Sequence, residues 1–283
     1  MALYDHIAAC NVHSFDKKLP FRVGGAQTGW MRRDLAERMA RWTQYFKITE
    51  NGVDILESLN DIEARSNALA EAGSALVVEQ FLPVRRKELC PVMEQFGGEI
   101  LMHIDRAWLE SFGVNSYGVH VNGYVQTVDG PELWIGVRAK DREVAPGKLD
   151  NMVAGGLPVG ISLAENVAKE AAEEAAVPEK LAKTARPVSV ITYRLDTKNG
   201  MRSDMLFVYD LELPAGFEPR NTDGEVGSFV KWPARRAVQL VDETNEFKFN
   251  VNLVIIDFAV RHGLVGPEHP DYARLVRGLR AWS

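Results

Sequence analysis

The segment from Gly155 to Val177 constrains the fold of this chain most, because it joins a glycine-rich loop to a helix with marked ends. Ser162 and Glu165 form the pattern of a capping box, in which the two residues satisfy each other's backbone N–H groups at a helix start. Pro178 disfavours helical backbone at Val177. The segment therefore predicts a loop followed by a helix of about three to four turns, a common length in globular proteins.

The two sides of this predicted helix differ in chemistry. One side carries small and apolar residues that permit close packing, namely Ala164, Val167, Ala168, Ala171 and Ala175. The adjoining face carries Glu170, Glu173 and Glu174 at three- and four-residue spacing. Like charges at this spacing repel by about 0.2–0.5 kcal/mol per pair, and bound Mg²⁺ or Mn²⁺ would reverse that cost. The glutamates indicate either a metal site or a solvated acidic face, and spacing alone favours the solvated face.

The chain after residue 116 is predicted to contain paired strands with few crossover helices. The turn residues Asp129-Gly130-Pro131 separate two strand-like segments and favour a hairpin. Such pairs disfavour a doubly wound parallel sheet and favour a mixed sheet between helices. The predicted strands are Val119–Val128, Leu133–Ala139, Val188–Leu195 and Met205–Leu213, and a last helix covers Phe249–His262.

The first part of the chain predicts a separate α+β domain. A length of 283 residues favours two units, and we place the boundary near Gly113, with an accessory domain over residues 1–116 and a second domain over 117–283. Helices are expected where apolar residues recur every three or four positions. The predicted elements of this domain are helices at Arg33–Lys47, Leu59–Ala72 (ending near Gly73) and Leu101–Phe112, and a strand at Ala75–Phe81.

Composition excludes some partners and compartments. The net charge of -6 argues against a nucleic-acid surface, which normally needs clustered lysine and arginine. Cys10 and Cys90 are the only cysteines, and sparse usage favours free thiols in a reducing compartment. The first ten residues lack a signal-peptide pattern, and no apolar run is long enough to span a membrane. We therefore expect a cytoplasmic protein and leave open whether it forms a homodimer.

The loop-helix segment resembles the Nudix signature, which runs Gly, five residues, Glu, seven residues, Arg-Glu, apolar, any, Glu-Glu, any, Gly, apolar. The matching positions are Gly155, Glu170, Ala171, Glu173, Glu174 and Val177. Three positions depart: Ile161 stands where the first Glu is expected, Lys169 replaces the Arg, and Ala176 replaces the last Gly. In the family the first Glu and the Arg look like a charge pair that supports the turn into the helix. Their replacement suggests an altered scaffold.

The resemblance implies a metal-dependent hydrolase of diphosphate linkages on a Nudix α/β/α sandwich. It implies that Glu170 and Glu174 are the principal ligands of Mg²⁺ or Mn²⁺, that Glu173 is a ligand or positions water, and that the Gly155 carbonyl contributes. Oxygen ligands suit such hard cations. The resemblance leaves the general base open. Glu225 follows Asp223-Gly224 and is either a further ligand or part of a simple turn.

The resemblance extends from Tyr117 to His262 and is similar to one Nudix subgroup. Its motifs are Asn122-Gly123-Tyr124-Val125, Leu133-Trp134-Ile135, Leu149-Asp150-Asn151 and Asp223-Gly224-Glu225-Val226. They resemble the Nudix part of fungal thiamine pyrophosphokinases, whose relatives also carry an extra N-terminal domain. That subgroup implies removal of oxidatively damaged thiamine diphosphate, with release of the monophosphate and phosphate. The alternatives are hydrolysis of ADP-ribose or a nucleotide sugar, a ligand-binding module without catalysis, and an isomerase on the same fold.

Other polar and aromatic residues have two interpretations each. Basic residues before the loop either bind the substrate diphosphate or are solvated, with arginine better suited to bidentate contacts; they are Arg138, Lys140, Arg142 and Lys148. Aromatic residues in strands either stack on a heteroaromatic ring or, as we favour, fill the core; they are Tyr124, Trp134 and Phe207. Asp257 interrupts an apolar run, so we expect it to accept a buried hydrogen bond and to lie outside the site.

Overall fold

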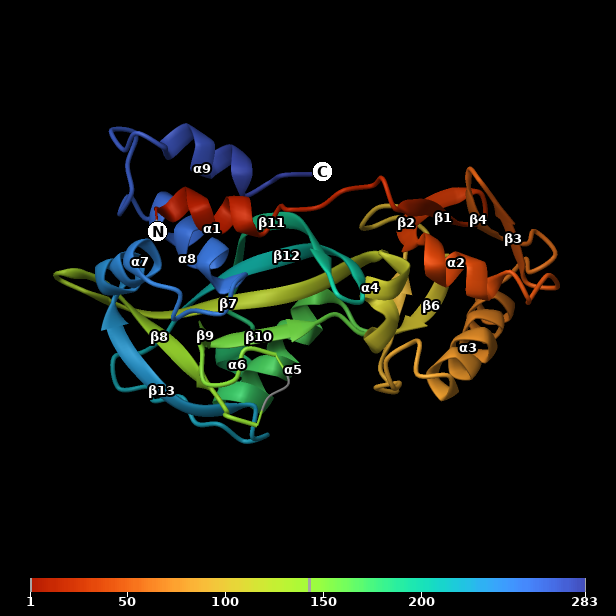
Figure 1. Cartoon of the computed structure of the whole chain (residues 1–283). Helices are drawn as coiled ribbons and strands as arrows, with labels where there is room; N and C mark the ends of the chain where they lie inside the picture. Colours follow the sequence, from red (N-terminus) through yellow and green to blue (C-terminus); the bar gives the residue numbers. More distant parts are fainter. Residues whose placement is uncertain (1, 142–143, 283) are drawn as a thin grey trace.

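The computed structural model describes residues 2–141 and 144–282. These residues form two units: a larger one, drawn mostly in green and blue with the red helix α1 (Leu3–Ala9), and a smaller one, drawn mostly in orange (Figure 1). None of the described helices has both the length and the apolar character needed to cross a bilayer.

The larger unit is built on a mixed sheet. Its strands are β7 (Asn115–Thr127), β8 (Gly130–Arg138), β9 (Leu149–Asn151), β10 (Val153–Gly156), β11 (Arg186–Thr197), β12 (Gly200–Glu212) and β13 (Val226–Pro233). The main path runs β11-β12-β7-β8-β13, with β10 beside β7 and β9 beside β8. β7 is parallel to β12 and antiparallel to β8 and β10. The predicted mixed sheet is confirmed, as is the hairpin, in which Thr127 pairs with Gly130.

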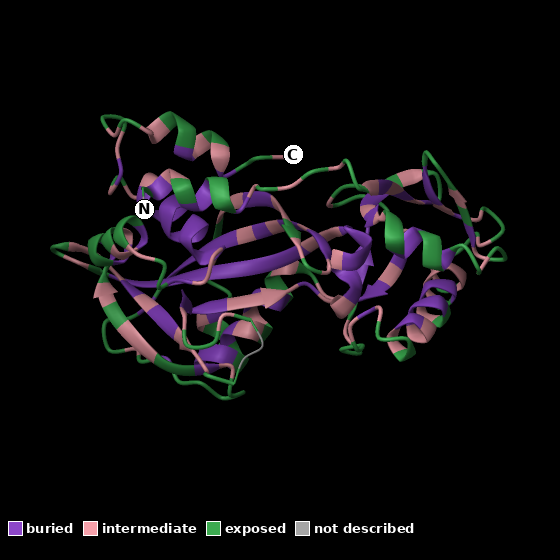
Figure 2. Cartoon of the chain, in the orientation of Figure 1, coloured by how far each residue is buried: buried purple, intermediate pink, exposed green. Residues whose placement is uncertain are grey.

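Helices cover both faces of this sheet. One face carries α5 (Leu163–Ala175) and α6 (Glu179–Ala182), and the other carries α1 (Leu3–Ala9), α7 (Ala234–Glu243), α8 (Val251–Arg261) and α9 (Tyr272–Gly278). Side chains alternate between the faces of a strand. Accordingly, Val119 and Val121 of β7 belong to the core beneath α5, whereas Tyr124 belongs to the core beneath α8. β7 and α8 are almost entirely buried (Figure 2). The predicted α/β/α sandwich is confirmed.

The smaller unit, called the accessory unit below, has an α+β fold with its own core. Its elements are β1 (Lys18–Val23), β2 (Ala26–Arg32), α2 (Arg33–Met39), β3 (Phe46–Thr49), β4 (Gly52–Ile55), α3 (Ile62–Val78), β5 (Leu89–Val92), β6 (Met102–Asp105), the 3₁₀ turn η1 (Arg106–Trp108) and α4 (Leu109–Phe112). The sheets are β2-β1-β4-β3 and β5-β6. Phe21, Leu69 and Trp108 lie fully buried at the centre. The predicted α+β class of this part is confirmed.

Two of the predicted helices in the accessory unit have the wrong extent. The helix predicted to reach Lys47 ends at Met39, because Phe46 pairs with Ile55 in a strand. The helix predicted over Leu101–Phe112 is β6 followed by a turn and the short α4.

The predicted strand Ala75–Phe81 is also wrong. α3 continues through Gly73 to Val78, so that most of this segment is helical. Gly73 does not end the helix but allows close packing, because a Cβ there would lie 2.5 Å from ring carbons of Trp108. The glycine allows the indole to pack directly against the helix backbone, which the sequence pattern does not reveal.

The first helix does not pack with the accessory unit. α1 contacts α8 and α9, and Leu3 and Ile7 lie in the core of the larger unit. Figure 1 shows α1 beside these two helices and far from the accessory unit. Because Leu3 and Ile7 are four residues apart, they share one helix face and are buried together. α1 therefore packs outside the core of the accessory unit, and the predicted domains 1–116 and 117–283 stay a prediction.

Candidate active site

The loop-helix segment begins where β10 leaves the sheet. Ser162 Oγ accepts a hydrogen bond from the Glu165 N–H at 3.2 Å, and Glu165 Oε2 accepts one from the Ser162 N–H at 2.7 Å. The predicted capping box is therefore confirmed. At the other end α5 stops at Ala175, and Ala176 takes a left-handed conformation with φ 51°. This is the conformation for which the signature's last glycine is suited.

Glu174 is the most buried of the three predicted site glutamates on α5, with 6% of its surface exposed. Its Oε2 accepts a hydrogen bond of 2.8 Å from the Ala154 N–H in β10. Burial raises the pKa of Glu174 well above its usual value, and the nearby carboxylates of Asp150, Glu170 and Glu225 raise this pKa further. The structure thus places the predicted residue Glu225 near Glu174, although the two are far apart in sequence.

Glu170 lies against Gly155, as the signature implies. A Cβ on residue 155 would be 2.3 Å from Glu170 Cδ, so any larger residue there would displace the Glu170 side chain from this position. Burial raises the pKa of Glu170, while Lys169 opposes that shift. Lys169 Nζ lies 3.1 Å from Glu170 Oε1 and 2.8 Å from Glu173 Oε2. The Glu173 side chain is 48% exposed, so its role as ligand or water-positioning group stays a prediction.

The donor set fits a divalent cation. Across residues 2–141 and 144–282, no three Asp, Glu, His or Cys side chains are already gathered in a metal-binding geometry. However, Glu174 Oε2 accepts the Ala154 N–H, and the carboxylates of Asp150, Glu170 and Glu225 are within electrostatic reach of Glu174. Neighbouring buried carboxylates disfavour each other's ionisation unless a cation compensates them. Carboxylate oxygens are the ligands that Mg²⁺ and Mn²⁺ prefer.

The replacement of the signature's first Glu by Ile161 has a structural reason. Ile161 packs against an apolar cluster centred on Met93, Tyr117 and Leu157, which also contacts Phe96. Met93 and Phe96 belong to the accessory unit, whereas Leu157 and Ile161 belong to the loop before α5. In addition, the Val159 N–H donates a 2.9 Å hydrogen bond to the Leu89 carbonyl of β5. Apolar contacts with the accessory unit thus fix the loop in place of the charge pair that the signature's first Glu and Arg imply.

The structure separates Arg138 from Lys148, two of the four basic residues considered as diphosphate ligands. Arg138 Nη1 lies 2.6 Å from Asp150 Oδ2 and lines a cavity of about 630 Å³ that Glu225 also lines. Lys148 donates to the Asn245 carbonyl and lines a different cavity of about 300 Å³. Arg138 is therefore placed beside the carboxylates and Lys148 is not. Arg142 lies outside the described residues.

Three residues near the loop, Arg106, Glu88 and Asp150, are not assigned to the site from the sequence. Arg106 of the accessory unit packs against Gly156, where a Cβ would lie 3.0 Å from the Arg106 Cζ. Its Nη1 donates to both oxygens of Glu88, at 3.0 and 2.9 Å. Asp150 occurs in a quoted motif, yet only the fold reveals that it pairs with Arg138 near Glu174.

The aromatic and remaining polar candidates belong to the core. Tyr124 is 4% exposed, and the Phe207 ring packs on Phe96 with 4.4 Å between centroids. Trp134 is partly buried against the core beneath α5. Asp257 accepts hydrogen bonds of 2.7 Å from Ser189 and Arg261, which confirms the predicted buried bond.

The fold and the site together define a class of protein: an α/β/α sandwich in which a loop-helix segment presents acidic side chains beside the sheet. A family model described as a domain of unknown function (DUF4743) matches residues 2–116. Nudix hydrolase 24, chloroplastic, from Arabidopsis thaliana is 38% identical over 98% of this chain and 77% of its own length. Nudix hydrolase 20, chloroplastic, from the same plant is 36% identical over the same shares. Among solved structures, a Deinococcus radiodurans protein is 21% identical over 59% of this chain and 95% of its own, with a TM-score of 0.44.

This chain belongs to the Nudix hydrolase family, because relatives of that name align with nearly its whole length. It is a pyrophosphohydrolase enzyme of that family. The family resemblance of the loop-helix segment is thereby confirmed. The closer resemblance to the thiamine pyrophosphokinase subgroup stays a prediction.

Proposed function

We propose that this enzyme cleaves the diphosphate linkage of a small organic diphosphate and releases a monophosphate and phosphate. The observation that carries the proposal is the buried Glu174, which lies beside Glu170 and Glu225 with one oxygen bonded to the Ala154 N–H. Nudix hydrolases generally use divalent metal ions, and we propose Mg²⁺ or Mn²⁺ here. Glu170 and Glu174 would hold the ion, with Glu225 and the Gly155 carbonyl beside them.

Each residue contributes a distinct part of the chemistry. A bound divalent ion supplies neutralisation of the diphosphate charge and a lower pKa for the attacking water. The Ala154 N–H fixes the orientation of the Glu174 carboxylate. The ion pairs of Lys169 with Glu170 and Glu173 stabilise the exposed face of α5. One of Glu170, Glu173 and Glu174 would accept the proton of the attacking water, and the geometry favours none of them as this base.

We propose oxidised thiamine diphosphate as the leading substrate, followed by ADP-ribose and nucleotide sugars. The ranking is supported by the resemblance of motifs such as Leu149-Asp150-Asn151 to the thiamine pyrophosphokinase subgroup. A small organic diphosphate also suits the cavity of about 630 Å³ beside Glu225, since small-molecule pockets are generally about 300–1,000 Å³.

Product analysis on a substrate panel tests this proposal. Wild-type protein is incubated with Mg²⁺ or Mn²⁺ and with intact and oxidised thiamine diphosphate, ADP-ribose, a nucleotide sugar and a nucleoside triphosphate. We expect metal-dependent release of monophosphate and phosphate, fastest from the oxidised thiamine compounds. Turnover of another compound of the panel would support the same reaction with a different substrate. Binding of a diphosphate without its cleavage would contradict the proposed reaction.

We also propose a reducing, cytoplasmic location and a functional division of the chain near residue 116. The location is supported by Cys10 and Cys90, which are both free and buried. The division is supported by the separate apolar core of the accessory unit, which contains Phe21 and Trp108. Fractionation of cells that contain the native protein tests the location, and its recovery with an oxidising compartment would contradict it.

A further inference from the structure

We infer that the accessory unit supplies part of the substrate-binding site, with Arg106 donating to the substrate diphosphate beside Gly156. The inference rests on the proposed function, because it assigns a binding role within the same site. It gives the accessory unit a direct part in recognising an organic diphosphate.

The position of Arg106 is the first observation. An added Cβ on Gly156 would lie 3.0 Å from both Cζ and Nη2 of Arg106, and 3.3 Å from its Nε. The face of the guanidinium, near its Nε–Nη2 edge, therefore lies against the loop that leads to α5. Arg106 and Glu170 are also within electrostatic reach of each other.

The pairing of Arg106 leaves this edge available to a ligand. Its hydrogen bonds to Glu88 both come from Nη1, and Nε and Nη2 donate to no other described residue. The side chain is 36% exposed. A guanidinium edge with two parallel N–H groups matches the oxygens of a phosphate group. Glu88 thus orients the arginine through Nη1 and leaves Nε and Nη2 without an acceptor among the described residues.

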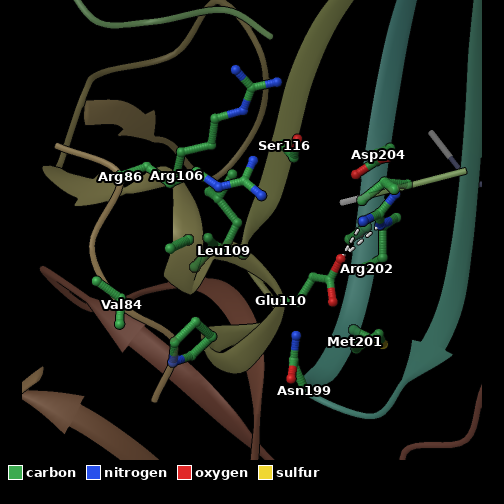
Figure 3. Close-up of a pocket in the computed structure, with 15 residues that line it drawn as sticks. Val84, Arg86, Arg106, Leu109, Glu110, Ser116, Asn199, Met201, Arg202 and Asp204 are labelled. Carbon is green, nitrogen blue, oxygen red and sulfur yellow. Dashed lines mark hydrogen bonds and ion pairs between the residues drawn. The ribbon is translucent and has the colours of Figure 1, made fainter. Parts of the chain in front are cut away.

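Two cavities lined by Arg106 offer space for the ligand. Arg106, Arg86 and Arg202 line both the cavity of about 630 Å³ beside Glu225 and a second cavity of about 620 Å³. Figure 3 shows Arg86 and Arg106 on one wall of the second cavity and Arg202 on the opposite wall, paired with Glu110. The two cavities share these side chains, so a diphosphate at Arg106 has room for its organic group in the second one.

The walls of the second cavity indicate the class of organic group. Apolar side chains such as Leu109 and Met201 lie beside hydrogen-bonding groups such as Ser116 and Asn199. Figure 3 shows these residues around the same space. Mixed walls of this kind suit a polar ring system, which needs both apolar contact and a few oriented hydrogen bonds.

The test measures diphosphate binding and turnover in matched arginine variants. Imidodiphosphate, which lacks a cleavable P–O–P bridge, is titrated with Mg²⁺ into folded wild type, Arg106→Gln, Arg106→Lys and Arg85→Gln. Arg85 is the control, because it is 38% exposed, pairs with Asp105 and lines neither cavity. We expect Arg106→Gln to weaken binding about 10- to 100-fold, as expected for loss of charged hydrogen bonds, and to raise KM more than it changes kcat. Arg106→Lys should recover part of the loss, and Arg85→Gln should bind like wild type.

A second variant leaves every charge in place. Gly156→Ala puts a methyl group where the Arg106 guanidinium lies, and should also weaken imidodiphosphate binding. Equal binding by wild type and Arg106→Gln, or no binding by wild type, would overturn the inference. If binding depends on Arg106 but no organic diphosphate is turned over, the result would contradict the proposed function and support the binding site.

Discussion

The Ala154 N–H donates a 2.8 Å hydrogen bond to Glu174 Oε2 and thereby joins β10 to the carboxyl end of α5. This bond orients a carboxylate that burial and three neighbouring carboxylates make costly to ionise. One backbone donor offsets only part of that cost. The relationship explains how the chain positions a buried acidic group, and why a cation beside it would stabilise the site.

Ala176→Gly should stabilise the protein. Ala176 has φ 51°, a left-handed conformation that costs an L-residue about 1–2 kcal/mol. Glycine removes this cost, but it also gives the unfolded chain more conformational entropy, which offsets part of the gain. We expect the free energy of unfolding to rise by about 0.5–1 kcal/mol in denaturant titrations, with unchanged kcat. Ala175→Gly is the matched control inside the helix and should destabilise the protein by about 1 kcal/mol or more. Destabilisation by Ala176→Gly would contradict this account of the helix end.

Ile161→Glu should not improve catalysis, although it restores the residue of the family signature. The carboxylate would enter the apolar cluster around Met93 and Leu157, so we expect a loss of about 1–3 kcal/mol in unfolding free energy. The double variant Ile161→Glu with Lys169→Arg should retain this loss. A rise in kcat with undiminished stability would show that the accessory unit does not replace the family's charge pair.

Asp210 should contribute to acid unfolding. Burial alone would raise the pKa of Asp210, but hydrogen bonds from His262 and Arg261 hold this pKa at about 2, below the ordinary 3.8. A lowered pKa stabilises the folded state above about pH 4, and that stability is lost as the pH falls through about 2. The contribution is about 2 kcal/mol. Unfolding free energies at about pH 5 and pH 2 should differ less in Asp210→Asn, and an equal difference would contradict the assignment.

Cys10 and Cys90 should resist alkylation in the folded protein. Burial raises the pKa of each thiol to about 12, so little reactive thiolate is present at neutral pH. Mass spectrometry after iodoacetamide treatment at pH 7.5 should detect labelling of both residues only after denaturant is added. Rapid labelling of native protein would show that these cysteines are accessible.

The sequence predicts the site better where local patterns determine it. The capping box at Ser162 and the helix that presents Glu170 and Glu174 depend on neighbouring residues, and both are present. The position of Arg106 depends on how the accessory unit packs against the loop, which no spacing encodes. Gly73 shows the same limit, since its contact with Trp108 turns an expected helix end into a packing site.

Metal-dependent hydrolysis by Glu174→Gln tests the central claim most directly. The change keeps the side chain's size and removes the charge that the site is proposed to offer a cation. Its control is Glu179→Gln, an exposed glutamate that pairs with Lys183 on α6. We predict that Glu174→Gln lowers kcat by about two to four powers of ten, equivalent to about 3–5 kcal/mol, and weakens Mg²⁺ activation, while Glu179→Gln is unchanged. Near-wild-type turnover by Glu174→Gln would contradict the assignment of this carboxylate to the reaction.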